Sequence, residues 1–221
     1  MKLCFDYIEQ PKKHKTRQNT SCKSNDTTSF FIPKEKDTLF WCYYIIINGI
    51  QNYEKLFNNT YKEEKQQKIN FIEKMRNHKD ILKKYKFKKT ELEADLAYSD
   101  TISIRSFLAM CAIENKNIAL LKNRCLYTLI SNDSQNIDIV KMNEHRFGCL
   151  LLDEKEKTKL FNEYTGKYWL IDNISKPIAG KSCYKLLQLQ DIAKKLNIPI
   201  INENGKKLKK IDLYNLINEK I

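Results

Sequence analysis

The sequence predicts an α+β fold: a helical N-terminal half, then a mostly antiparallel sheet, then a C-terminal helix–loop–helix. Three observations carry this prediction. Apolar residues recur at helical spacing up to about residue 115, short β-rich segments follow up to about residue 171, and helical spacing returns after residue 184. With 221 residues, 42% of them hydrophobic, the chain can build one packed domain and a small appendage.

Four helices are expected in the N-terminal half, over residues 39–57, 62–84, 91–98 and 103–115. Asp37 or Thr38 can cap the first of them, because short polar side chains accept hydrogen bonds from the free amides of a first turn. Asn48-Gly49 can interrupt the same helix. The second helix has an apolar face and a Lys-rich face, which is either solvated or a binding surface.

Five short segments rich in β-branched and aromatic residues come next, separated by polar turns. These expected strands cover residues 118–121, 126–130, 137–142, 147–152 and 167–171. Two further helices, over 184–196 and 208–220, close the chain. We therefore divide the chain into a basic polar arm (1–36), an α+β core (37–178) and a tail (179–221). The arm is expected to be partly disordered, because it is polar and contains few apolar residues.

The net charge of +13 comes from three segments and not from the whole chain. Residues 1–36 carry +4, residues 55–89 carry +8 and residues 181–221 carry +5, while residues 90–180 carry −2. Of the 40 basic residues, 35 are Lys and only 5 are Arg. Because Lys is a hydrated point charge and Arg is the bidentate reader of bases, this balance favours attraction to a polyanion over sequence readout.

Several classes of protein are not supported. No apolar stretch reaches the 18 residues of a membrane-spanning helix, and no signal peptide is recognisable, so no membrane partner is expected. The seven cysteines are scattered without a Cys-x-x-Cys pair, and the three histidines are far apart in the sequence. We expect no metal and no cofactor. Reduced, mostly buried cysteines indicate a reducing compartment.

One set of residues could form a thiol active site. Cys42 lies in the first turns of a predicted helix, His145 precedes a predicted strand, and Asp172 and Asn173 follow a later one. A nucleophilic cysteine requires a stabilised thiolate, an imidazole base and a group that orients the imidazole. The same residues have a simpler interpretation, with Cys42 as a small core residue and His145 as a surface loop residue.

This part of the chain resembles papain-like cysteine peptidases, in the broad sense that includes ovarian-tumour-type deubiquitinases. The resemblance lies in the order of these residues, in the helix 103–114 that precedes the strand at 117–121, and in the strand Tyr168-Trp169-Leu170-Ile171. The resemblance covers roughly residues 37–173. It implies a helical half that carries the nucleophile Cys42 and a β half that carries the base His145, which Asn173 or Asp172 would orient. It also implies a protein or ubiquitin-like substrate. An inactive descendant of the same fold is a third interpretation.

The tail carries the most specific pattern. A helix with Leu186, Leu189, Ile192 and Leu196 is followed by an extended loop, a Gly-Lys pair and a Lys-rich helix, over about 38 residues. This pattern resembles SAP and Rho-N-terminal-like modules, and the resemblance implies that the loop and the start of the second helix approach nucleic-acid phosphates. The matching residues are Gly205, Lys206, Lys207, Lys209 and Lys210. The alternative is a helical hairpin that docks on the core or on another protein while its lysines are solvated.

As a whole, the chain resembles a family of proteins encoded by giant nucleocytoplasmic DNA viruses, through residues 37–46 and 194–198 and the Lys-rich helix that follows. This implies residence in the host cytoplasm, in a viral factory or in the virion. Two functions are expected. One is a viral cysteine peptidase, active or inactive, whose tail binds nucleic acid, with DNA and low sequence specificity expected. The other is a non-enzymatic nucleic-acid-binding or virion structural protein, and a third hypothesis is an assembly protein with acidic partners.

Overall fold

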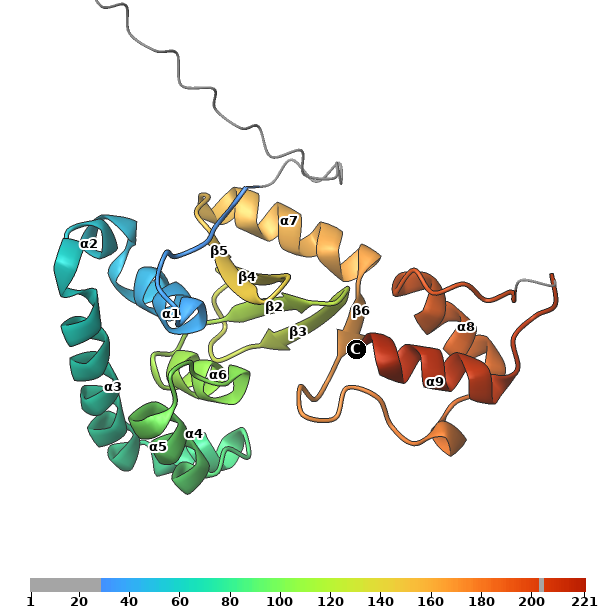
Figure 1. Cartoon of the computed structure of the whole chain (residues 1–221), viewed down its shortest axis with the longest axis horizontal. Coiled ribbons are helices and arrows are strands. Elements are labelled where there is room, and N and C mark those ends of the chain that lie inside the picture. The colour runs from blue at the N-terminus through green and yellow to red at the C-terminus, as the bar shows by residue number, and fades with distance from the viewer. Residues whose placement is uncertain (1–28, 203–204) are drawn as a thin grey trace, which may run out of the picture.

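The fold is a mixed sheet with helices on both faces and a helical tail at one end (Figure 1). The structure is a computed structural model that describes residues 29–202 and 205–221, so most of the predicted arm lies outside the described residues. Its strands are β1 (Phe30–Phe31), β2 (Ile118–Lys122), β3 (Cys125–Leu129), β4 (Asp138–Asn143), β5 (Arg146–Leu150) and β6 (Trp169–Ile171). The combination of helices and one sheet agrees with the predicted α+β class.

The strand order is β1-β5-β4-β2-β3-β6, and the sheet is less antiparallel than expected. Strands β1 and β5, β4 and β5, and β2 and β3 pair antiparallel, whereas β2 pairs with β4, and β3 with β6, in parallel. Parallel pairs need crossover connections. The loop after β3 leads to β4, on the other side of β2. The helix after β5 crosses the sheet and leads to β6, which lies beside β3.

The N-terminal helices follow the predicted ones, with two divisions. They are α1 (Thr38–Asn48), α2 (Ile50–Glu54), α3 (Thr60–Asn77), α4 (Lys79–Lys84), α5 (Lys89–Tyr98) and α6 (Ile104–Ile113), with a 3-10 turn η1 (Phe57–Asn59). Asp37 caps α1 by accepting a hydrogen bond from the Phe40 amide at 3.1 Å. Gly49, at φ 83°, ends α1, as the Asn-Gly pair indicated. The helix predicted over 62–84 is divided at His78 into α3 and α4.

One helix was not predicted. Helix α7 (Glu154–Lys167) begins at Asp153, whose carboxylate accepts a hydrogen bond from the Glu156 amide at 2.8 Å. It lies on the face of the sheet away from α1 and α6 (Figure 1). The predicted strand over 167–171 therefore shortens to β6, because the helix continues through Thr165-Gly166, which read as a turn.

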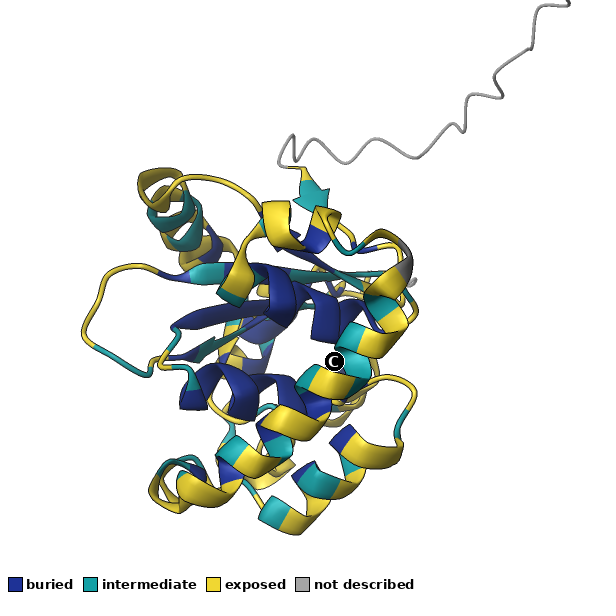
Figure 2. Ribbon diagram, turned by 90° about the vertical axis from the view of Figure 1, so that its left-hand side faces the viewer, coloured by how far each residue is buried: buried dark blue, intermediate teal, exposed yellow. Residues whose placement is uncertain are grey.

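Most residues of the central strands are buried (Figure 2). Because side chains alternate along a strand, the sheet contributes to one core on each face. On one face, Leu120 and Val140 pack with α1 and α6, whose Phe40 and Phe107 are fully buried. On the other face, the inward side of α7 covers a smaller set of strand residues: Ala119, Leu121, Leu126, Ile139 and Leu150. The layers thus run from α1 and α6, through the sheet, to α7.

The tail packs at the β6 edge of the sheet. It contains a 3-10 turn η2 (Lys181–Cys183) and the helices α8 (Leu186–Lys195) and α9 (Lys210–Lys220). Its own core joins the sheet through Cys125 and Ile171. Arg124, in the β2–β3 turn, donates from Nε to the Lys195 carbonyl at 2.8 Å. The two tail helices form the predicted helix–loop–helix, and they dock on the core.

Candidate nucleic-acid interface

Cys42 lies inside α1 and is completely buried. Its thiol shares a hydrogen bond with the thiol of Cys149 on β5, and this bond, followed by burial, raises the pKa of Cys42 well above its usual value. A cysteine nucleophile needs the opposite, an accessible thiol with a lowered pKa. The surroundings of Cys42 are those of a small core residue.

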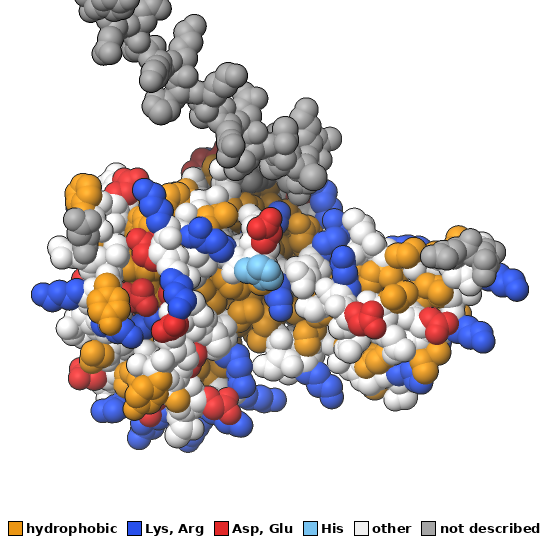
Figure 3. All heavy atoms as spheres, in the orientation of Figure 1, with side chains coloured by type: hydrophobic (Ala, Val, Ile, Leu, Met, Phe, Trp, Pro, Cys, Tyr) orange, Lys and Arg blue, Asp and Glu red, His pale blue; other side chains and the backbone are white. Residues whose placement is uncertain are grey.

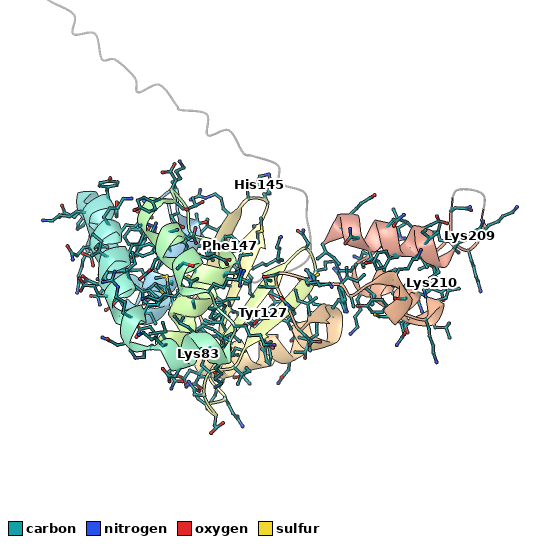
Figure 4. All side chains as sticks on the ribbon, turned by 90° about the horizontal axis from the view of Figure 1, so that it is seen from below. Lys83, Tyr127, His145, Phe147, Lys209 and Lys210 are labelled. Carbon is teal, nitrogen blue, oxygen red and sulfur yellow. The ribbon has the colours of Figure 1, made fainter. Side chains whose placement is uncertain are left out.

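His145 lies in the exposed turn between β4 and β5 (Figure 4). The neighbouring Phe147 amide donates to Thr38 Oγ1 at 2.9 Å, so this turn is attached to the start of α1. Cys149, which contacts Cys42, is four residues further along the extended β5 strand. At about 3.3 Å per residue, the Cα atoms of His145 and Cys149 are about 13 Å apart. Cys42, which is next to Cys149, is therefore too far from His145 for a thiol–imidazole contact.

Asp172 and Asn173 follow β6, at the opposite edge of the sheet. They lie at the end of the sheet where β2 begins, whereas His145 lies at the end where β2 finishes. Asn173 Oδ1 accepts a hydrogen bond from the Ser175 amide at 2.9 Å, which closes a local turn. The structure therefore does not bring Cys42, His145, Asp172 and Asn173 together, because His145 lies diagonally across the sheet from Asp172 and Asn173.

Alkylation with iodoacetamide tests the state of Cys42. Among the described cysteines, Cys183 is exposed while Cys42, Cys111, Cys125 and Cys149 are buried. We expect Cys183 to react in the native protein and Cys42 to react only after unfolding, because alkylation needs an accessible thiolate. Peptide mapping by mass spectrometry, with the denatured protein as the control, measures this. Selective, rapid modification of Cys42 in the folded protein would contradict this expectation.

The predicted tail residues, in contrast, are brought together. The chain after α8 forms a narrow loop in which Ile201 pairs with Lys207, and the Asn202 amide donates to the Lys206 carbonyl at 2.9 Å. Gly205 has a φ of 72°, a left-handed conformation that favours glycine. The loop leads directly into α9, so Gly205, Lys206, Lys207, Lys209 and Lys210 lie along one continuous stretch at the outer end of the tail.

The charges of this stretch are available to a ligand. Lys206, Lys207 and Lys209 are exposed and Lys210 is half-buried. Within the described residues, none of the four has a carboxylate within ion-pair distance. Helix α9 begins at Lys210, and no side chain of the described residues caps its first turn. Figure 3 shows basic side chains at the outer end of the tail, and Figure 4 places Lys209 and Lys210 there.

One group of aromatic residues that line a hollow was not predicted from the sequence. Tyr85, Phe87 and Tyr127 are half-buried rings that line a hollow together with Asp172 and Asn173. The run of residues 83–89, in which lysines alternate with Tyr85 and Phe87, is the signal that could have found two of the three rings. Tyr127 comes from β3, and its contribution depends on the folded chain.

No family model, curated protein or solved structure matches this chain. Within residues 29–202 and 205–221, no helix is both long and apolar enough to cross a bilayer. The same part of the chain contains no cluster of three His, Cys, Asp or Glu side chains arranged to hold a metal ion.

Proposed function

We propose that this protein is a non-enzymatic nucleic-acid-binding protein whose tail holds the phosphate backbone with little sequence specificity. The single observation that carries the proposal is the short stretch of Lys206, Lys207, Lys209 and Lys210. Three of these lysines are exposed and Lys210 is half-buried, and none has an acidic partner among the described residues. Lysines at a loop and a helix start are suited to phosphates, because the ammonium groups and the helix amides both attract anions.

The fixed position of the tail supports this proposal. Asn123 Nδ2 donates to the Ile221 carbonyl at 3.2 Å, and Arg124 donates to the carbonyl of Lys195. These bonds and the shared apolar core hold the far side of α8 and α9 against the sheet. The lysine stretch lies at the outer end of the tail, away from that contact, so the core would not obstruct a bound strand (Figure 1). The scarcity of Arg favours backbone contacts over base readout.

The thiol-peptidase hypothesis is not part of this proposal. It requires a contact between Cys42 and His145, and the geometry of α1 and β5 gives it no support. DNA is the expected ligand, and the host cytoplasm, a viral factory or the virion is the expected location. Composition and the resemblance to proteins of giant DNA viruses support that location.

The proposal is tested by measuring the affinity of the full chain for a DNA duplex at increasing salt, using fluorescence anisotropy. We expect replacement of Lys206, Lys207, Lys209 and Lys210 by Gln to weaken binding about 10- to 1,000-fold at about 0.1 M salt. The slope of log K against log salt should become less negative by up to about 3.6, since each lost phosphate contact removes about 0.9.

A matched control removes the same charge elsewhere. Lys55, Lys62, Lys155 and Lys159 are exposed and form no ion pair with the described residues, so their replacement by Gln changes the net charge equally. We expect this control to weaken binding much less than the tail variant. Equal losses for both variants, or no loss for the tail variant, would refute the tail as the binding site.

A further inference from the structure

A second basic surface contains a hollow of about 400 Å³ with aromatic walls. Its lining comes from four parts of the chain: the α4–α5 loop, the start of α6, strand β3 and the segment after β6. The lining residues are Tyr85, Lys86, Phe87, Arg105, Tyr127, Asp172, Asn173, Ile174 and Ser175. This volume is within the range of about 300–1,000 Å³ that is typical of pockets for small ligands.

The aromatic wall is held in place before any ligand arrives. The Tyr85 hydroxyl donates to the Ile130 carbonyl at 2.8 Å, and the rings of Tyr85 and Phe87 lie 6.1 Å apart at an angle of 30°. The loop between these rings ends α4 with two backbone bonds, from Lys86 to Lys83 and from Phe87 to Leu82. A rigid wall of this kind loses little conformational entropy when a flat ligand stacks on it.

Tyr127 supplies the third ring and a free hydroxyl. This hydroxyl makes no hydrogen bond to the described part of the chain. A tyrosine hydroxyl is protonated at neutral pH. Burial, and secondarily the nearby Tyr85 hydroxyl, raise the pKa of Tyr127 further. Asn173 adds an amide whose oxygen is already engaged with the Ser175 amide. The hollow thus offers flat apolar surfaces and a few polar groups, which is the chemistry that heteroaromatic bases require.

The α4 side of the hollow is basic, whereas the exposed carboxylate of Asp172 lines the side that follows β6. Lys83, Lys84 and Lys86 are exposed and have no ion-pair partner in the described chain, and Lys84 Nζ lies 5.1 Å from the centre of the Tyr85 ring. The basic groups further along, Lys88 and Arg105, are in contrast paired with Glu91. In Figure 3, basic side chains gather along the lower margin of the helical half, and Figure 4 labels Lys83 and Tyr127 in this part of the molecule.

We propose that this hollow receives an unpaired base of a single-stranded nucleic acid, which stacks on Tyr127 and Phe87 while the adjacent phosphates contact Lys83, Lys84 and Lys86. This inference rests on the proposed function and adds a strand preference to it. A base inside a duplex is already stacked and cannot enter a hollow, whereas a single strand can turn a base outward. The tail lysines contact phosphates alone, so they do not distinguish the two forms.

The experiment compares a single-stranded oligonucleotide with the corresponding duplex for the full chain, three variants of the hollow and the tail Lys→Gln variant. We expect Tyr127→Leu and Phe87→Leu each to weaken single-strand binding about 5- to 150-fold, since each removes one stacking surface. Duplex binding should remain unchanged. Tyr127→Phe retains the ring and should retain most of the single-strand affinity. A fluorescent base analogue in the strand should be quenched by the native protein and not by Tyr127→Leu.

The outcomes separate the hollow from the tail. If the tail Lys→Gln variant loses binding while Tyr127→Leu and Phe87→Leu leave the ratio of single-strand to duplex affinity unchanged, the base pocket is refuted and the tail interface stands. If no variant affects any nucleic acid, both are refuted. Free nucleotide should compete only at concentrations far above those of the oligonucleotide, because it lacks neighbouring phosphates. Competition at equal concentrations would overturn the assignment to a strand. Circular dichroism confirms that each variant is folded.

Discussion

Replacement of Asp37 by Ala is expected to lower the free energy of unfolding by about 3–5 kcal/mol. Asp37 is only 1% exposed and holds three donors at once: the Phe40 amide at 3.1 Å, the Ile102 amide at 3.0 Å and Lys68 Nζ at 2.7 Å. Its loss leaves Lys68 buried with one carboxylate instead of two. Removing one partner of a buried ion pair is costly because the remaining charge stays out of water.

Chemical denaturation followed by circular dichroism measures this effect. Asp100→Ala is the matched control, since Asp100 also pairs with a lysine, Lys36, but both side chains are exposed. Exposed ion pairs contribute little, so the control should leave the denaturation midpoint unchanged. A double variant, Asp37→Asn with Lys68→Met, should be less destabilised than Asp37→Ala, because it retains the helix cap and removes the fully buried charge of Lys68. Glu64, which also loses Lys68, is partly exposed and still accepts a hydrogen bond from Trp41 Nε1. Equal midpoints for Asp37→Ala and the control would contradict the prediction.

The same contact shows what a sequence pattern leaves open. Lys68 belongs to the Lys-rich helix 62–84, whose basic face was predicted to be solvated or to form a binding surface. Lys68 is instead buried. Burial alone would lower the pKa of its ammonium group, but the hydrogen bonds that this group donates to Asp37 and Glu64 outweigh burial and raise the pKa. The partner lies 31 residues away in sequence, and the periodicity of a single helix carries no information about it.

The elements that could be predicted are those that local sequence determines. The cap at Asp37, the break at Gly49 and the strand segments follow from side chains that act on their own backbone. Helix α7 was missed because its apolar residues, such as Leu160 and Tyr164, are few and its Thr165-Gly166 pair resembles a turn. Strand β1 has two residues, too few for any alternation, and exists because it pairs with β5.

The candidate sites differ in the same way. The tail lysines are adjacent in sequence, so a local pattern was enough to bring them together. The thiol set required a particular strand order, and the observed order separates β5 from β6 by three strands. The aromatic hollow was missed because it too depends on non-local packing, which places Tyr85 and Phe87 of the α4–α5 loop beside Tyr127 of β3, about 40 residues later. Non-local strand pairing is the step that periodicity does not encode.

Asn117→Leu is the second substitution for which a large loss of stability is expected, about 2–5 kcal/mol. Asn117 is 3% exposed and precedes β2. Its Oδ1 accepts hydrogen bonds from the amides of Ser131 and Asn132 at 2.7 and 3.1 Å, and its Nδ2 donates to the Ser134 carbonyl at 2.8 Å. Leu has a similar volume but no polar atoms, so these backbone groups would lose their partner while the loop remains folded against them.

Because of the position of this loop, we expect the substitution to have a local effect in addition to a lower denaturation midpoint. The loop leads from β3 into the parallel pairing of β4 with β2, and the Asp138 amide donates to the Asn117 carbonyl at 2.9 Å. Ile130, just before the loop, accepts the hydroxyl of Tyr85 and so anchors the aromatic hollow. We expect hydrogen exchange at the Ser131 and Asn132 amides to accelerate before global unfolding. Asn218 is an exposed residue on α9, and Asn218→Leu should change neither the denaturation midpoint nor the exchange rate of these two amides. If Asn117 only filled space, Leu would preserve the slow exchange of both amides, because packing alone would protect them.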